Sequence, residues 1–168
     1  MTSKQARELL LSGKLPPGTT IEDWLDLDGC TSLQSLPNDL KVEGYLDLFG
    51  CTSLQALPDG LMVERWLDLE GCTSLQSLPK GLKVEGELNL YGCTSLQSLP
   101  DGLKVEGYLN LYGCTSLQLP YGIPEGVKGE VWVDEEVLRN NKDHLLMLVN
   151  CRFSEESKVL YKKMLAEG

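Results

Sequence analysis

A repeat of 21 residues constrains the fold of this chain more than any other feature. The word Cys-Thr-Ser-Leu-Gln recurs at this spacing, with a Leu-x-Leu pair before it and a Leu-Pro pair after it. The repeated cysteines are Cys30, Cys51, Cys72, Cys93 and Cys114. Self-similarity at a fixed period of this length is typical of a solenoid, in which each repeat packs only on its neighbours.

The Leu-x-Leu pairs predict one short strand in each repeat. Alternation along a strand places both leucines on one side and the middle residue on the other. Parallel strands lie about 4.8 Å apart, so equivalent residues stack into ladders and the leucines build one continuous core. The pairs are Leu25/Leu27, Leu46/Leu48, Leu67/Leu69, Leu88/Leu90 and Leu109/Leu111.

Imperfect repeats flank the regular ones. Leu15-Pro16-Pro17-Gly18 matches the later Leu-Pro words, and Val131-Trp132-Val133 matches the Leu-x-Leu strands. Before that last strand the register slips, because one Ser is missing after Gln118 and two extra residues precede Val131. We predict six repeats over residues 15–134, an N-terminal capping helix in 1–14 and a helical C-terminal cap in 135–168, since uncapped solenoid ends expose their core.

Helix signals mark both ends. Thr2 or Ser3 can cap a helix that ends near Gly13 and turns Ala6, Leu9 and Leu10 to one side. In the tail, residues 135–138 and 144–149 are expected to be helical, and Ser154 is expected to cap a helix that reaches Ala166. The apolar residues of that last helix are Val159, Leu160, Met164 and Leu165. The tail is interpreted as a cap, and a partner-docking element is the alternative.

The full repeat, Leu-x-Leu-x-Gly-Cys-Thr-Ser-Leu-x-x-Leu-Pro, resembles the leucine-rich repeat family in its cysteine-containing form. It is similar to repeats of plant immune receptors and to the Leu-Pro repeats of bacterial effectors. The resemblance implies a curved array of parallel strands whose concave face binds a partner. One position departs from it: the apolar residue before each strand is Val42, Val63, Val84 or Val105, one place earlier than in the family. A second extended segment on the convex side is therefore expected instead of a helix.

Charge and cysteine content narrow the function classes. A formal net charge of −10 disfavours nucleic acid as a partner, since phosphate binding needs a basic surface. No apolar run approaches the roughly 20 residues of a membrane span, so membrane insertion is not expected and a cytoplasmic location is. The cysteines are then reduced thiols. Cysteines stacked in a line do not converge as zinc ligands do, so we expect small buried side chains with the thiol turned to the backbone.

No catalytic constellation stands out in the sequence. His144 is the only histidine, and no nucleophile shares a recognisable motif with it. The glycines mark the ends of repeats and form no phosphate-binding word. We therefore expect neither an enzyme nor a cofactor.

The outward strand positions carry the functional hypothesis. Aromatic residues beside a column of carboxylates are the kind of residues that anchor interfaces. The candidate partner-binding residues are Trp24, Asp26, Tyr45, Asp47, Trp66, Asp68, Asn89, Tyr108, Asn110 and Trp132. We predict a protein-interaction module whose partner has a basic or mixed surface. The alternatives are a carbohydrate-binding module, an inert or designed scaffold, a translocated effector, and a face that is merely solvated.

Overall fold

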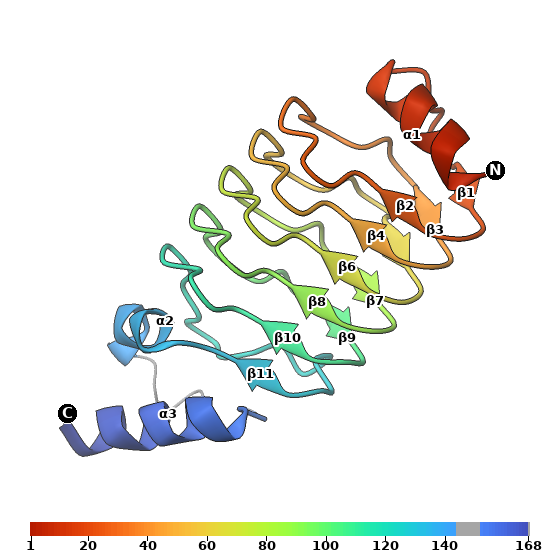
Figure 1. The fold of residues 1–168 in the computed structure, drawn as a ribbon. Coiled ribbons are helices and arrows are strands. Elements are labelled where there is room, and N and C mark those ends of the chain that lie inside the picture. Colours follow the sequence, from red (N-terminus) through yellow and green to blue (C-terminus); the bar gives the residue numbers. More distant parts are fainter. Residues whose placement is uncertain (144–151, 168) are drawn as a thin grey trace.

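The computed structural model describes residues 1–143 and 152–167, and it shows the chain wound into a coil of stacked repeats (Figure 1). Two parallel β-sheets run along the coil, one helix lies at its N-terminal end and two lie near its C-terminal end. The prediction of a solenoid of short parallel strands with helices at both ends is confirmed. Within the described residues, no helix is long and apolar enough to cross a bilayer.

The Leu-x-Leu segments form a six-stranded sheet. Leu46 pairs with Leu67 and Asp47 with Asp68, so equivalent residues of neighbouring repeats lie side by side. The amide of each repeat donates to a carbonyl of the next, as Leu46 N does to Trp66 O at 2.9 Å. The strands are β2 (Leu25–Asp26), β4 (Leu46–Asp47), β6 (Leu67–Asp68), β8 (Leu88–Asn89), β10 (Leu109–Asn110) and β11 (Val131–Trp132).

The valine segments form a second, five-stranded sheet beside the first. Only residues 22–24 separate the strand that ends at Ile21 from the strand that begins at Leu25, so the two sheets meet at a tight corner. The second extended segment expected from the valine position is confirmed. The strands are β1 (Thr20–Ile21), β3 (Lys41–Val42), β5 (Met62–Val63), β7 (Lys83–Val84) and β9 (Lys104–Val105).

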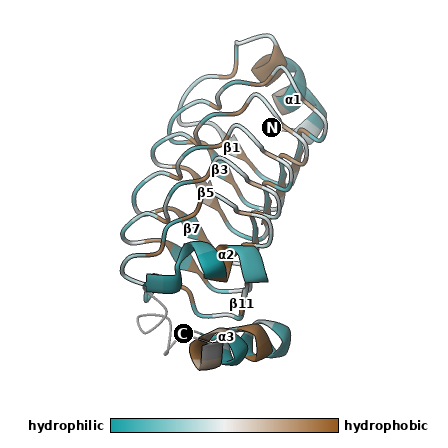
Figure 2. Ribbon diagram, turned by 90° about the vertical axis from the view of Figure 1, so that its left-hand side faces the viewer, coloured by the Kyte–Doolittle hydropathy of each residue, from teal (hydrophilic) through white to brown (hydrophobic). Residues whose placement is uncertain are grey.

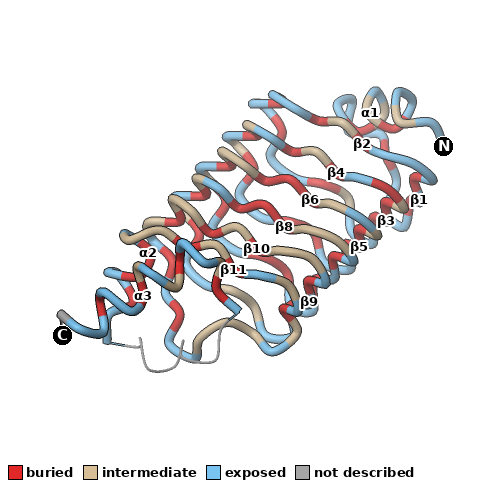
Figure 3. The backbone as a smooth tube through the Cα atoms, turned by 60° about the horizontal axis from the view of Figure 1, so that its bottom comes forward, coloured by how far each residue is buried: buried red, intermediate tan, exposed pale blue. Residues whose placement is uncertain are grey.

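Stacked leucine and valine ladders fill the interior. Figure 3 shows buried segments at the same place in successive repeats. Both leucines of each Leu-x-Leu pair are fully buried, as Leu67 and Leu69 illustrate. Burying one such side chain contributes about 1.5–3 kcal/mol relative to leaving it in water, but only when a neighbouring repeat covers it.

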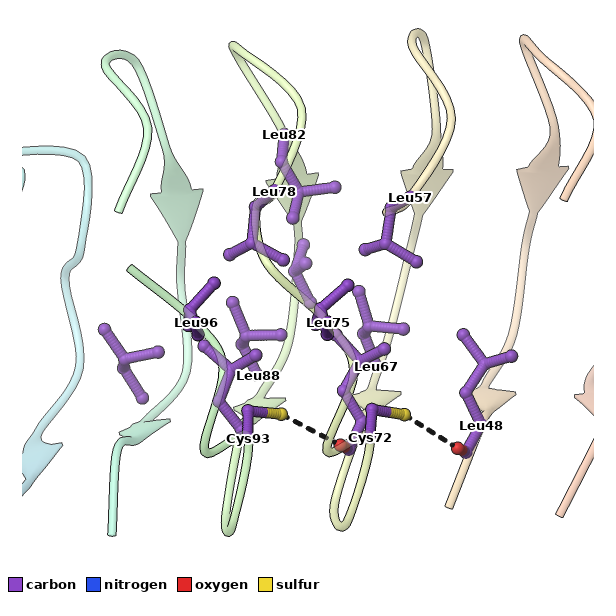
Figure 4. Packing of buried hydrophobic residues seen from close by; sticks show 14 of the residues in the cluster. Leu48, Leu57, Leu67, Cys72, Leu75, Leu78, Leu82, Leu88, Cys93 and Leu96 are labelled. Carbon is purple, nitrogen blue, oxygen red and sulfur yellow. Dashed lines mark hydrogen bonds between the residues drawn. The ribbon is translucent and has the colours of Figure 1, made fainter. Parts of the chain in front are cut away.

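The cysteines form a ladder of buried thiols. Cys72 Sγ donates to the carbonyl oxygen of Leu48 at 3.2 Å, and Cys93 Sγ donates to that of Leu69 at 3.1 Å (Figure 4). All five repeat cysteines are buried and none is in a disulfide. The expectation of a small buried side chain with its thiol turned to the backbone is confirmed.

Helix α1 (Ser3–Leu11) closes the N-terminal end of the coil. Thr2 Oγ1 accepts a hydrogen bond from the Gln5 amide and Gln5 Oε1 accepts one from the Thr2 amide, which is a capping box. Ala6 and Leu10 are buried on the core, and Arg7 Nη1 donates to the Asp26 carbonyl at the open edge of the first strand. The helix ends before Gly13, whose φ is +69°.

Helices α2 (Glu135–Asn140) and α3 (Glu155–Glu167) lie at the C-terminal end (Figure 2). Two of the three helices predicted in the tail are present, and the third, at 144–149 with His144, lies outside the described residues. The apolar residues singled out in α3 do not all face the core: Met164 is buried and Leu160 partly buried, but Val159 and Leu165 are exposed. Tyr161 is buried in their place, against Phe153.

Two polar side chains form hydrogen bonds with the backbone of the last repeats. Asn141 Nδ2 donates to the Leu117 carbonyl at 2.9 Å, while Asn141 Oδ1 accepts from the Leu119 amide. Ser157 Oγ accepts from the Val133 amide and donates to the Val133 carbonyl, both at 2.9 Å. These bonds occupy backbone groups that the next repeat would otherwise pair, so they end the stack.

Candidate interaction face

The six-stranded sheet presents three outward columns of residues, which we call the outer face. Its middle column lies between the leucines of each pair and contains Asp26, Asp47, Asp68, Asn89, Asn110 and Trp132. The column before each pair contains Trp24, Tyr45, Trp66, Glu87, Tyr108 and Glu130. The column after each pair contains Asp28, Phe49, Glu70, Tyr91, Tyr112 and Asp134. The structure thus brings all ten candidate residues onto one surface.

Aromatic residues gather on the outer face. It holds eight of the chain's eleven aromatic residues: all three Trp, four of the six Tyr and one of the two Phe. Trp24, Tyr45 and Phe49 are each 45% exposed, and Tyr91 is 48% exposed. Phe49 and Tyr91 come from the third column, which the sequence-based site did not include although strand alternation places it on the same side.

The middle column is held in place by its own hydrogen bonds. Asp47 Oδ1 accepts from the Phe49 amide at 2.9 Å, and each equivalent Asp or Asn from Asp26 to Asn110 accepts from the amide two residues on. Asn89 Nδ2 also donates to Asp68 Oδ1, and Asn110 Nδ2 donates to Asn89 Oδ1, both at 3.1 Å. The asparagines therefore link neighbouring repeats, whereas the aspartates cannot donate to one another.

Burial and mutual repulsion affect the aspartates. Burial, with a smaller contribution from the charge of Asp26, raises the pKa of Asp47. Burial also raises the pKa of Asp68, and the charge of Asp47 adds to it. Asp68 and Asn89 are buried, so Asp68 affects the outer face through its charge and Asn89 through its hydrogen bonds to neighbouring repeats, and neither offers much surface for direct contact.

A shallow pocket lies in the N-terminal half of the outer face. Its volume is about 440 Å³, and Trp24, Tyr45 and Trp66 line it together with Asp47 and Glu87. The rings of Tyr45 and Trp66 meet edge to face, with centroids 6.1 Å apart and planes at 83°. Trp66 Nε1 is buried and has no acceptor within the described part of the chain. A buried donor without a partner is uncommon in a fold optimised only for stability.

Two further aromatic residues stack on each other at the other end of the outer face. The rings of Tyr108 and Trp132 stack with centroids 4.8 Å apart and an interplanar angle of 5°. Burial, with Glu87 nearby, raises the pKa of the Tyr108 hydroxyl. The outer face thus carries an aromatic pocket at one end and a stacked aromatic pair at the other.

A second hollow lies away from the outer face. It measures about 550 Å³ and lies where the register slips, with Leu99, Pro100, Pro120 and Tyr121 in its wall. Leu109 pairs with Val131, 22 residues on, which confirms the slip. The missing Ser leaves Leu99 only partly covered, so the hollow follows from a local deletion and shares no residue with the outer face.

No protein-family model, curated protein sequence or solved structure matches this chain. Among the described residues, no group of three or more His, Cys, Asp or Glu side chains is arranged to hold a metal ion. The functional argument therefore rests on the outer face itself.

Proposed function

We propose that the protein is an interaction module that binds a protein partner with a basic or mixed surface through the outer face. One observation carries the proposal: most of the chain's aromatic residues stand on one side of one rigid sheet, around a column of carboxylates. Exposed aromatic clusters leave apolar surface in contact with water, which a partner can cover. Tryptophan and tyrosine are also enriched in interface hot spots.

The backbone of the outer face favours binding because it is already ordered. Strands β4, β6, β8 and β10 are paired on both sides, the outer edge of β2 is met by Arg7 of α1, and the middle column fixes the turn that follows each strand. A preorganised surface loses little conformational entropy when a partner arrives. The carboxylates would steer a basic partner toward the face and raise its association rate.

A carbohydrate ligand is the second candidate. The stacked rings of Tyr108 and Trp132, next to Asn110 on the paired strands, offer apolar surface of the kind that packs against a sugar ring. We also infer that the repeats are of the leucine-rich type and that the chain works in a reducing compartment, where its five buried thiols stay free.

The direct test is affinity capture with matched variants. The immobilised protein, the double variant Trp24→Ala/Tyr45→Ala and the control Met62→Ala/Lys83→Ala are exposed to extracts of the source cells and to a glycan array. Met62 and Lys83 are exposed on the five-stranded sheet, so the control removes comparable side chains from another side.

We expect a protein that the wild type and the control capture and that the outer-face variant loses. A ligand found only on the glycan array would favour the carbohydrate function. A protein captured equally by both double variants would contradict the proposal. Circular dichroism would show that each variant remains folded.

A further inference from the structure

We propose that the pocket between Trp24, Tyr45 and Trp66 receives an arginine side chain of the partner. This inference rests on the proposed function and names the chemistry of its central contact. It is carried by an aromatic enclosure, two carboxylates in its wall and a guanidinium of the chain itself that already lies against one of the rings.

The walls of the pocket suit a flat cation. Tyr45 and Trp66 meet edge to face, so together they present a corner with two ring surfaces, and Trp24 closes a further side. The volume of about 440 Å³ is enough for one guanidinium and its methylene stem. Aromatic faces attract cations through the negative charge of the ring.

The charges around the pocket favour a cation as well. Asp47 and Glu87 line it, and Asp26 and Asp68 flank Asp47 within the middle column. Arg7 lies 3.4 Å from Asp26 Oδ1 and so balances that carboxylate in part. Asp47 Oδ1 accepts the Phe49 amide, and a carboxylate has about four acceptor positions, so Asp47 can also receive a donor from a guest.

Arg65 shows that a guanidinium can pack on the Tyr45 ring, and it competes with an arginine of the partner for that ring. Its guanidinium carbon lies 5.9 Å from the centroid of the Tyr45 ring. The equivalent positions of neighbouring repeats are Gly44 and Gly86, so the repeat does not need an arginine there. Arg65 occupies one side of Tyr45 and adds positive charge beside the pocket, and both effects oppose a second cation.

Arginine fits this pocket better than lysine or a metal ion. The guanidinium is planar, stacks on rings, is weakly hydrated and donates through several N–H groups to a carboxylate. Lysine holds its water more strongly, and calcium prefers a shell of six to eight oxygen atoms, which a ring-lined pocket lacks.

The test uses two pentapeptides that differ at one side chain. One has arginine between glycines, and the other has citrulline, which keeps the planar shape and part of the N–H donors but has no charge. Each is titrated into the 168-residue protein while the three indole N–H signals are followed by NMR. Trp24 and Trp66 line the pocket, whereas Trp132 lies at the other end of the outer face and serves as an internal reference.

We expect millimolar binding of the arginine peptide that moves the Trp24 and Trp66 signals and leaves Trp132 unchanged. The citrulline peptide should bind at least about fivefold more weakly. Asp47→Asn should weaken arginine binding about threefold, and Arg65→Gly should strengthen it about threefold because the competitor is removed. The inference is overturned if the two peptides bind equally, if Trp132 shifts as much as the other indoles, or if Arg65→Gly binds equally or less well.

The two proposals fail in distinguishable ways. Capture that depends on Trp24 and Tyr45, with no preference for arginine over citrulline, would keep the outer face as the interface and overturn the arginine contact. Suppose instead that capture does not depend on Trp24 and Tyr45 but the NMR shifts are selective for arginine. The pocket would then bind arginine, and the proposal that the captured protein binds there would be overturned.

Discussion

The middle column of the outer face should limit stability, so its neutralisation should stabilise the fold. Asp26 pairs with Asp47, and Asp47 pairs with Asp68, in directly opposed positions of neighbouring strands. In the next repeats the same column carries Asn89 and Asn110, whose amides bridge the repeats. The triple variant Asp26→Asn/Asp47→Asn/Asp68→Asn extends this amide ladder and keeps the acceptor oxygen that each turn uses.

The expected change in the free energy of unfolding follows from the charge pairs and hydrogen bonds that the three replacements change. Two opposed like-charge pairs are removed, each worth about 0.2–1 kcal/mol. The partly exposed Arg7–Asp26 ion pair is lost as well, which costs about 0–1 kcal/mol. Two amide-to-carbonyl hydrogen bonds are added, each worth about 0.5–1.5 kcal/mol. We therefore expect the free energy of unfolding to rise by about 2 kcal/mol at pH 7, measured by urea denaturation. The control Asp59→Asn/Asp101→Asn/Glu125→Gln changes the net charge equally at exposed positions and should have a much smaller effect.

The difference in the free energy of unfolding between the triple variant and the wild type should also depend on pH. Burial raises the pKa of Asp47 and Asp68, so the folded chain binds these protons more tightly than the unfolded chain. Wild-type stability therefore rises as the pH falls through the folded pKa toward the unfolded value of about 4, and the advantage of the triple variant shrinks. Lower stability of the triple variant at pH 7, with calcium stabilising only the wild type, would refute this reasoning and identify a cation site.

Three further predictions concern the core and the cap. Leu69→Asp should lower the free energy of unfolding by more than about 3 kcal/mol, because it buries an unpaired charge; an unchanged melting curve would contradict the core assignment. A thiol reagent should label the native cysteines slowly, since burial raises the pKa of Cys72 to about 12, and rapidly once denaturant is added; fast native labelling would oppose the buried ladder. Asn141→Ala should lose about 1–3 kcal/mol by unpairing the Leu119 amide, and more than the exposed control Asn140→Ala; equal losses would remove Asn141 from the cap.

The period and the alternation of the sequence were sufficient to predict the strands and the core, whereas the third column of the outer face was left out of the predicted site. Once Leu46 stacks on Leu67, the register requires Asp47 to stack on Asp68. The valine one place before its usual position also correctly predicted a second extended segment instead of a helix. Local repetition determines these features, so one sequence suffices for them.

Contacts outside the repeat pattern could not be predicted in this way. The bonds of Asn141 and Ser157 to the last repeats depend on where the tail returns to the coil, which no period encodes. The orientation of α3 depends on the same packing, so Tyr161 is buried and Val159 is not. Arg65 could have been noticed, because it interrupts a position otherwise occupied mainly by glycine, but its place over Tyr45 depends on its side-chain conformation.

The most direct test of the outer face as the interface is the affinity of the captured partner across a series of salt concentrations. The wild type, the triple asparagine variant and Trp66→Ala are compared, with each variant's folding verified by circular dichroism. We expect the triple variant to bind more weakly and its affinity to depend less on salt, because the three carboxylates that it lacks act mainly by steering the partner. Trp66→Ala should lose more affinity than any single aspartate replacement. Unchanged affinity and unchanged salt dependence in both variants would show that the outer face is only a solvated surface.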